Sequence, residues 1–190
     1  MEKKDLKPAG VFKYFEEICQ VPRPSKKEEK IIAYLKAFGA KHNLETKVDE
    51  AGNVLIKKPA TPGKENLQTV VLQSHIDMVC EKNNDVQHDF LTDPIETEID
   101  GEWLKAKGTT LGADNGIGVA TELAILADDS IEHGPLECLF TVDEETGLTG
   151  AFELKEGFMS GDILLNLDSE DEGEIFIGCA GGIDSVAEFA

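Results

Sequence analysis

Four stretches of this sequence share one pattern, in which an apolar run breaks off into histidine, aspartate or glutamate. They are VVLQSHIDM, LGADNGIGV, LFTVDEETG and ILLNLDSED, at residues 70–78, 111–119, 139–147 and 163–171. Apolar runs of this length, bounded by turn residues, are typical of buried strands. Strand ends that each carry a side chain of a metal-ligand type predict one polar site at one edge of a sheet.

Helices are expected between these runs. Apolar residues at helical spacing predict a first helix, which the Pro22/Pro24 pair must end. Ser25 and Glu28 match the S-x-x-E capping box, so a second helix is expected to open there and to stop near Gly39. Two further helices are predicted over residues 115–127 and 149–154.

Strands are expected to alternate with these helices, which predicts a three-layer α/β domain with a mostly parallel sheet. Asp100-Gly101 suits the tight turn of a hairpin. Residues 175–179 and 183–190 also predict strands, and because the chain stops inside the second one, we expect a fragment of a longer protein. The other expected strands cover residues 44–48, 53–56, 67–74, 95–99, 102–106, 136–142 and 162–167.

Acidic residues outnumber basic ones by 38 to 18, which gives a formal net charge of −20. Nucleic acids and anionic membranes repel such a chain, so neither is expected as a partner. The first residues lack the apolar core of a signal peptide, and no segment reaches transmembrane length. The cysteines lie far apart without CxxC spacing, which predicts reduced thiols in a cytoplasmic protein. They are Cys19, Cys80, Cys138 and Cys179.

His75 and Asp77 lie at the end of the expected 67–74 strand. Residues two apart on an extended strand point to the same side, so the two side chains can touch. A metal-bound imidazole commonly donates its other N–H to a carboxylate, which orients the ring. The pair therefore indicates a metal ligand and its orienting partner. Because H-x-D is a short pattern, a core histidine beside a chance aspartate stays open as the alternative.

Asp114 lies between glycines at the start of an expected helix. Such glycines let the backbone approach a ligand closely or adopt unusual dihedral angles. The residues alone leave two interpretations open, a metal ligand and an aspartate N-cap. A phosphate-binding loop is excluded, because Gly112, Gly116 and Gly118 do not match G-x-G-x-x-G and the loop has no lysine.

Asp143, Glu144 and Glu145 follow a buried strand. Three consecutive carboxylates at the edge of a core repel one another unless a divalent cation compensates their charge. Because adjacent residues point to opposite sides of a strand, one glutamate can bind a metal while its neighbour acts as general base. The alternative is an exposed acidic turn without a function.

Asp168 ends the last expected strand and opens the acidic loop DSEDEGE. The first half of this loop resembles a calcium-binding EF-hand. The twelfth position is Cys179 instead of a glutamate, however, and no flanking helices are expected, so an EF-hand is excluded. The acids that follow Asp168 are expected to form a solvated turn.

Taken together, the motifs SHIDMV, GADNGIG, TVDEETG and LLNLDSED resemble the di-zinc peptidase family that includes carnosinase, peptidase T and glutamate carboxypeptidase. The resemblance implies that His75 and Asp168 hold one zinc ion and Glu145 the other, and that Asp114 bridges both. It further implies that Asp77 orients His75 and that Glu144 is the catalytic base. The peptide bond after Asp114 would be cis, as in the family.

By the same resemblance, residues 1–190 form the N-terminal part of a three-layer α/β/α catalytic domain. The family's lid domain, which forms homodimers, and a further zinc-ligand histidine have no counterpart here, so the second zinc site lacks a ligand. The implied activity is hydrolysis of dipeptides, of the Xaa-His type or broader, with Mn²⁺ or Co²⁺ as substitutes for the two zinc ions. Two alternatives are an N-acyl-amino-acid amidohydrolase and a metal-binding fragment with little or no activity.

Overall fold

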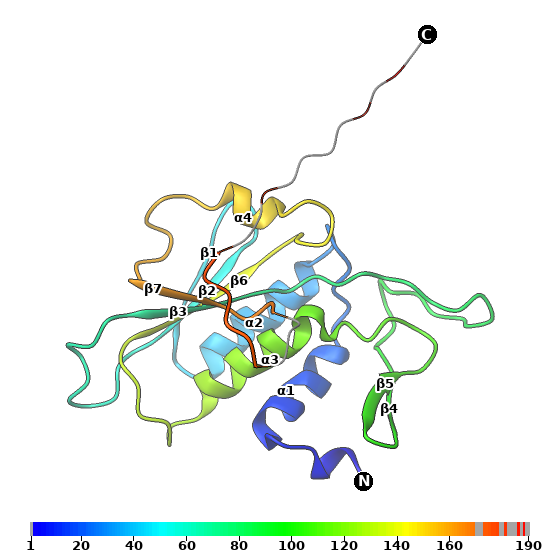
Figure 1. Cartoon of the computed structure of the whole chain (residues 1–190), viewed down its shortest axis with the longest axis horizontal. Coiled ribbons are helices and arrows are strands. Elements are labelled where there is room, and N and C mark those ends of the chain that lie inside the picture. Colours follow the sequence, from blue (N-terminus) through cyan, green and yellow to red (C-terminus); the bar gives the residue numbers. More distant parts are fainter. Residues whose placement is uncertain (1, 170–172, 179–180, 182–185, 187, 189–190) are drawn as a thin grey trace.

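The computed structural model describes residues 2–169, 173–178, 181, 186 and 188 of the chain. A five-stranded sheet with the order β1-β2-β6-β3-β7 forms its centre (Figure 1). The strands are β1 (Glu45–Val48), β2 (Val54–Lys58), β3 (Val70–His75), β6 (Leu136–Thr141) and β7 (Ile163–Asn166), and a separate hairpin consists of β4 (Thr97–Asp100) and β5 (Trp103–Ala106). The helices are α1 (Ala9–Cys19), α2 (Glu29–Lys41), α3 (Ala113–Ala127) and α4 (Thr149–Glu153), with a short 3₁₀ helix η1 (Lys3–Asp5) before them.

The sheet separates two helical layers of unequal size, which confirms the predicted three-layer α/β architecture. Figure 1 shows α1, α2 and α3 on one side of the sheet and α4 on the other. Successive side chains of a strand point to opposite faces of the sheet, so one strand contributes side chains to both layers. Val54 and Ile56 of β2 lie in the main core with the three larger helices, whereas Leu55 between them packs on the side of α4. All three are fully buried.

The sheet is mixed, and its parallel part positions the acidic motifs. Strand β3 pairs in parallel with β6 on one side and with β7 on the other, while β1, β2 and β6 pair antiparallel. The carboxyl ends of parallel strands meet at one edge of a sheet, where open α/β sheets bind their ligands. His75, the turn after β6 and Asp168 therefore reach the same edge, as the sequence predicted.

Three local predictions were wrong. The capping box does not form, because Ser25 donates its hydroxyl proton to Asp77 and Glu28 accepts hydrogen bonds from the backbone of Lys26 and Asp143. Helix α2 accordingly begins at Glu29. The hairpin turns one residue later than expected, since Asp100 pairs with Trp103 and the turn is centred on residues 101–102.

The third wrong prediction is the strand at 175–179, because residues 175–178 adopt no strand and are exposed. A strand needs a neighbouring strand to pair with. The strand expected over 183–190 falls largely outside the described residues, as do three acids of the expected turn after Asp168, residues 170–172.

The described cysteines are free thiols, as predicted, and Cys179 lies outside the described residues. Burial raises the pKa of the Cys19 thiol to about 12, so this group does not ionise near neutral pH. None of the helices in the described part of the chain combines the length and the apolar character that crossing a membrane requires.

Candidate metal centre

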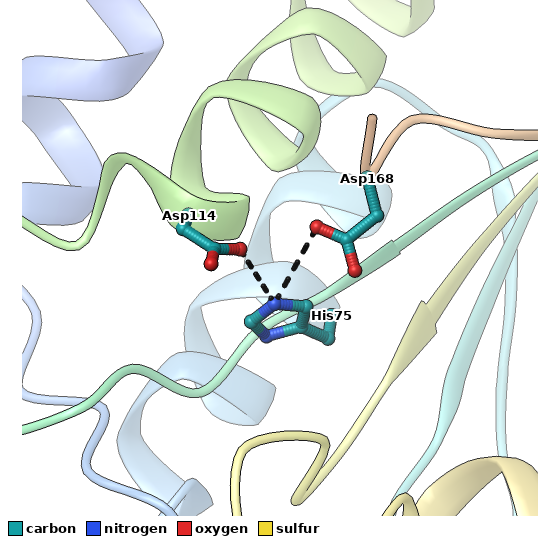
Figure 2. Close-up of side chains that lie close together, drawn as sticks. All are labelled: His75, Asp114 and Asp168. Carbon is teal, nitrogen blue, oxygen red and sulfur yellow. Dashed lines mark hydrogen bonds and ion pairs between the residues drawn. The ribbon is translucent and has the colours of Figure 1, made fainter. Parts of the chain in front are cut away.

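The imidazole of His75 is the centre of the acidic edge. His75 is the last residue of β3, and its side chain is 1% exposed. Its Nε2 atom lies 3.1 Å from Oδ1 of Asp114 and 3.8 Å from Oδ1 of Asp168. Figure 2 shows these two carboxylates, one from the start of α3 and the other from the end of β7, directed at the same ring nitrogen. Oε2 of Glu144 lies 3.9 Å from that nitrogen.

Asp77 holds the other side of the ring. Its carboxylate is fully buried, and Oδ1 lies 3.2 Å from Nδ1 of His75. Ser25 donates its hydroxyl proton to Oδ2 at 2.7 Å, and the backbone N–H groups of Glu144 and Glu145 donate to Oδ1 and Oδ2 at 3.0 and 3.2 Å. One carboxylate therefore fixes both the imidazole and the turn that carries the two glutamates. Asp77 is therefore a structural partner of His75, and the role of His75 as a metal ligand stays a prediction.

Two sets of ligand atoms meet at His75. Its imidazole with Asp114 and Asp168 forms one set, and the imidazole with Glu144 and Glu145 forms the other; within each set, the atoms lie within 4.8 Å of one another. An imidazole with several carboxylates is a donor set that suits zinc and related divalent ions. The structure thus brings together all of the predicted ligands.

The electrostatics of these groups are those of a site that binds a cation. Burial lowers the pKa of His75, but the hydrogen bond to Asp77 and the charge of Asp168 outweigh it and raise this pKa to about 9. Burial raises the pKa of Asp168 to about 6, and the charge of Asp114 acts in the same direction. Burial and the charge of Asp114 also raise the pKa of Glu145. Raised pKa values favour proton binding at positions where a divalent ion would neutralise the same charge.

Asp114 does not cap the helix that follows it. The N-cap residue of α3 is Gly112, with a φ of +67°, and no side chain caps it. The backbone at Asp114 and Asn115 is not helical, and the peptide bond between them is cis, as the resemblance implied. The carboxylate of Asp114 is 56% exposed and points back at His75. Of the two interpretations open from the sequence, the N-cap is therefore wrong.

The acidic turn after β6 is built around a buried residue. Asp143 is 4% exposed, has a φ of +48°, and accepts hydrogen bonds from the hydroxyl groups of Thr146 and Thr149. With Asp143 anchored inside, Glu144 and Glu145 reach the site only partly buried. The turn is therefore not simply exposed, and the functions of Glu144 and Glu145 stay predictions. No local pattern in the sequence distinguishes the structural role of Asp143 from the roles of the two glutamates.

A third group of carboxylates, Glu28, Asp77 and Asp143, is buried beneath the turn. Backbone N–H groups donate to Glu28, hydroxyl groups donate to Asp143, and both kinds of donor reach Asp77, so the three side chains form a structural network. Sequence analysis missed Ser25 and Glu28 as parts of this network, because their partners lie more than 50 residues away along the chain.

The remaining histidines lie elsewhere and are partly buried rather than exposed. His42 stacks on Phe38, and His88 contacts Phe90. Nδ1 of His133 hydrogen-bonds with the carbonyl of Gly134 at 2.7 Å.

Comparison with known proteins agrees with this geometry. The model of peptidase family M20/M25/M40 matches residues 71–185, which include His75, Asp114, the acidic turn and Asp168. This chain belongs to that family. Among family M20 relatives, the cytosol non-specific dipeptidase of Escherichia coli (strain K12) is 54% identical over 183 residues, or 96% of this chain. The match covers 38% of that protein's length.

Solved structures show the same relation. An aminoacylhistidine dipeptidase from Vibrio alginolyticus superposes with a TM-score of 0.91 at 56% identity, covering 94% of this chain and 36% of the other. An aminopeptidase from Bacillus cereus superposes with a TM-score of 0.72 at 26% identity, covering 85% of this chain and 43% of the other. This M20 chain therefore spans less than half the length of each of these three relatives.

Proposed function

We propose that this chain is the N-terminal part of the catalytic domain of a metal-dependent dipeptidase that uses two zinc ions. The observation that carries the proposal is the convergence of His75, Asp114 and Asp168, with Glu144 and Glu145 beside them, at the carboxyl edge of the sheet. Similarity to the dipeptidases of Escherichia coli and Vibrio alginolyticus supports dipeptides as the substrates. The name of the first relative supports a location in the cytosol.

The ligands divide between the two ions. His75 and Asp168 would hold one ion and Glu145 the other, and Asp114 would bridge them. Asp114 lies 3.1 Å from His75 and acts electrostatically on both Asp168 and Glu145, which suits a shared ligand. When bound, such ions supply Lewis acidity toward the scissile carbonyl and make a bound water more acidic.

The protein's own groups perform the remaining tasks. Asp77 would keep Nε2 of His75 free to bind a metal ion by holding Nδ1 on the opposite side of the ring. Glu144 stands 3.9 Å from Nε2 of His75 and belongs to the set with Glu145. Because Glu145 is assigned to the metal, the carboxylate of Glu144 is left to take a proton from water. The same carboxyl group would then pass this proton to the leaving amine.

The test compares Glu144→Gln with Glu145→Gln in the full protein. Glu144→Gln keeps the size of the side chain but removes the base, so turnover of dipeptides should fall about 10²- to 10⁴-fold with the zinc content unchanged. Glu145→Gln should lower the zinc content as well. Metal analysis and hydrolysis of an Xaa-His dipeptide measure both. Near-normal turnover by Glu144→Gln would refute the assignment of the base, and failure of the wild type to bind zinc would refute the metal centre.

A further inference from the structure

The connection between α1 and α2 carries Arg23, the only arginine in the sequence. This side chain is 3% exposed. Nη1 donates to the backbone carbonyls of Ile76 at 3.1 Å and Asp77 at 2.9 Å, and Nη2 donates to the carbonyl of Gly112. All of these acceptors are backbone atoms, and they come from two segments that are more than 30 residues apart in the sequence.

The glycines around Asp114 make room for this guanidinium group. A Cβ atom on Gly112 would lie 2.5 Å from Nη2 of Arg23, and one on Gly116 would lie 2.6 Å from the same atom. Both distances are far shorter than a nonbonded contact allows. The glycines that the sequence associates with a ligand are therefore needed, at least in part, for the close approach of Arg23.

The two segments that Arg23 joins carry the first ligands of the site. One segment continues directly from His75 and includes Asp77, and the other leads into Asp114. We propose that Arg23 is a positioning residue of the metal centre, which sets the separation of His75 and Asp114 by binding the backbone behind each of them. This inference rests on the proposed metal site and concerns a residue outside its ligand set.

The chemistry of the side chain suits this role. A guanidinium group is rigid and planar and offers five donors, so it can hold several carbonyls at fixed relative positions, whereas a lysine ammonium group acts as a point charge on a flexible stem. Burying a cation is unfavourable unless hydrogen bonds compensate it, and here the three backbone carbonyls supply those bonds. A buried cation beside a cation site also opposes metal binding. We expect the geometry that Arg23 imposes on the two segments to outweigh this repulsion.

The experiment measures zinc affinity in the full protein, by competition with a chromophoric chelator, for Arg23→Met and Arg23→Lys. Lys58→Met is the matched control, because Lys58 is 7% exposed and its Nζ also donates to two backbone carbonyls, those of Ile125 and Asp128, away from the site. Changes around a metal ligand typically lower affinity about 10- to 100-fold. We expect Arg23→Met to lower the zinc affinity at least about tenfold. The affinity of Arg23→Lys should lie between those of Arg23→Met and the wild type, and that of Lys58→Met should stay within about twofold of the wild type. The absorption bands of Co²⁺ bound in place of zinc should shift in the Arg23 variants alone.

The charge effect and the positioning effect have opposite signs, which makes the result decisive. If Arg23 acted only through its charge, Arg23→Met would bind zinc more tightly. Higher or unchanged affinity with an unchanged Co²⁺ spectrum would overturn the inference while leaving the metal centre intact. If the wild type itself bound no zinc, the proposed function would fail instead. Should Arg23→Met fail to fold, Arg23→Lys decides by the same criteria, because it keeps the charge and most of the volume.

Discussion

Asp77 allows the most direct quantitative test of the site without any metal. Hydrogen bonds from His75, Ser25 and the backbone of Glu144 outweigh the effect of burial and lower the pKa of Asp77 from 3.8 to about 2. A shift of this size corresponds to about 2–3 kcal/mol of stability. Asp77→Asn removes this charge. It also points the amide NH2 group at a hydrogen-bond donor that the carboxylate accepted from, and leaving that donor unsatisfied adds about 1–3 kcal/mol. We expect a loss of about 3–5 kcal/mol at pH 7.

The pH dependence of this loss follows from the direction of the shift. A carboxylate with a lowered pKa stabilises the folded state fully above the unfolded pKa and loses that contribution as the pH falls through about 2. About half of the charge-dependent part should therefore remain at pH 3. Urea unfolding of the EDTA-treated protein, followed by far-ultraviolet circular dichroism at both pH values, measures it.

The matched control is Asp49→Asn. Oδ1 of Asp49 accepts hydrogen bonds from the backbone N–H groups of Gly52 and Asn53 at 2.9 and 2.8 Å, but this residue is only half-buried and contacts no histidine. Its replacement should cost about 1 kcal/mol. If Asp77→Asn costs no more than this control at pH 7, the reasoning about Asp77 is wrong.

Two further predictions concern the core beneath the site. Glu122 is fully buried and accepts a hydrogen bond from Ser74, and because burial raises its pKa well above the usual value, its contribution to stability is lost as the pH rises above about 4.5. Between pH 5 and pH 8, the free energy of unfolding of Glu122→Gln should therefore rise relative to that of the wild type by up to about 1.4 kcal/mol per pH unit. Urea unfolding at both pH values measures this, and an equal difference between variant and wild type at the two values would contradict it. Gly116→Ala places a methyl group 2.6 Å from Nη2 of Arg23 and should lower the free energy of unfolding by about 2 kcal/mol or more. The control is Gly10→Ala on α1, where the nearest atom is 3.5 Å away, and this change should be neutral or stabilising by up to about 1 kcal/mol. Similar thermal unfolding midpoints for the two variants would refute the packing argument.

The position of the site could be predicted from sequence because strand ends have a strong local signature. An apolar run that stops at His75 or Asp168 identifies the end of a strand, and parallel pairing then brings such ends together. The roles of Arg23 and Ser25 could not be predicted in this way. The residues that they hydrogen-bond to lie 52 or more positions away in the sequence, and the local sequence pattern does not indicate which residues these are.

Local patterns also failed where tertiary contacts compete with them. The Ser25–Glu28 pattern is a sound capping box, but both side chains form hydrogen bonds across the site instead. The Ile-Phe-Ile run at 175–177 has strong strand propensity, yet it pairs with no strand among the residues that the structure describes and stays irregular. Propensity predicts an element only where the rest of the fold offers it a partner.

Asp77 is joined to residues 52, 67 and 68 positions away along the chain, through Ser25, Glu144 and Glu145. No contiguous piece of the polypeptide can therefore assemble the acidic edge before three distant segments have met, and detachment of any one of them disturbs the other two. Loss of Asp77 should therefore loosen both the imidazole of His75 and the turn that carries the two glutamates, although these groups belong to different strands of the sheet.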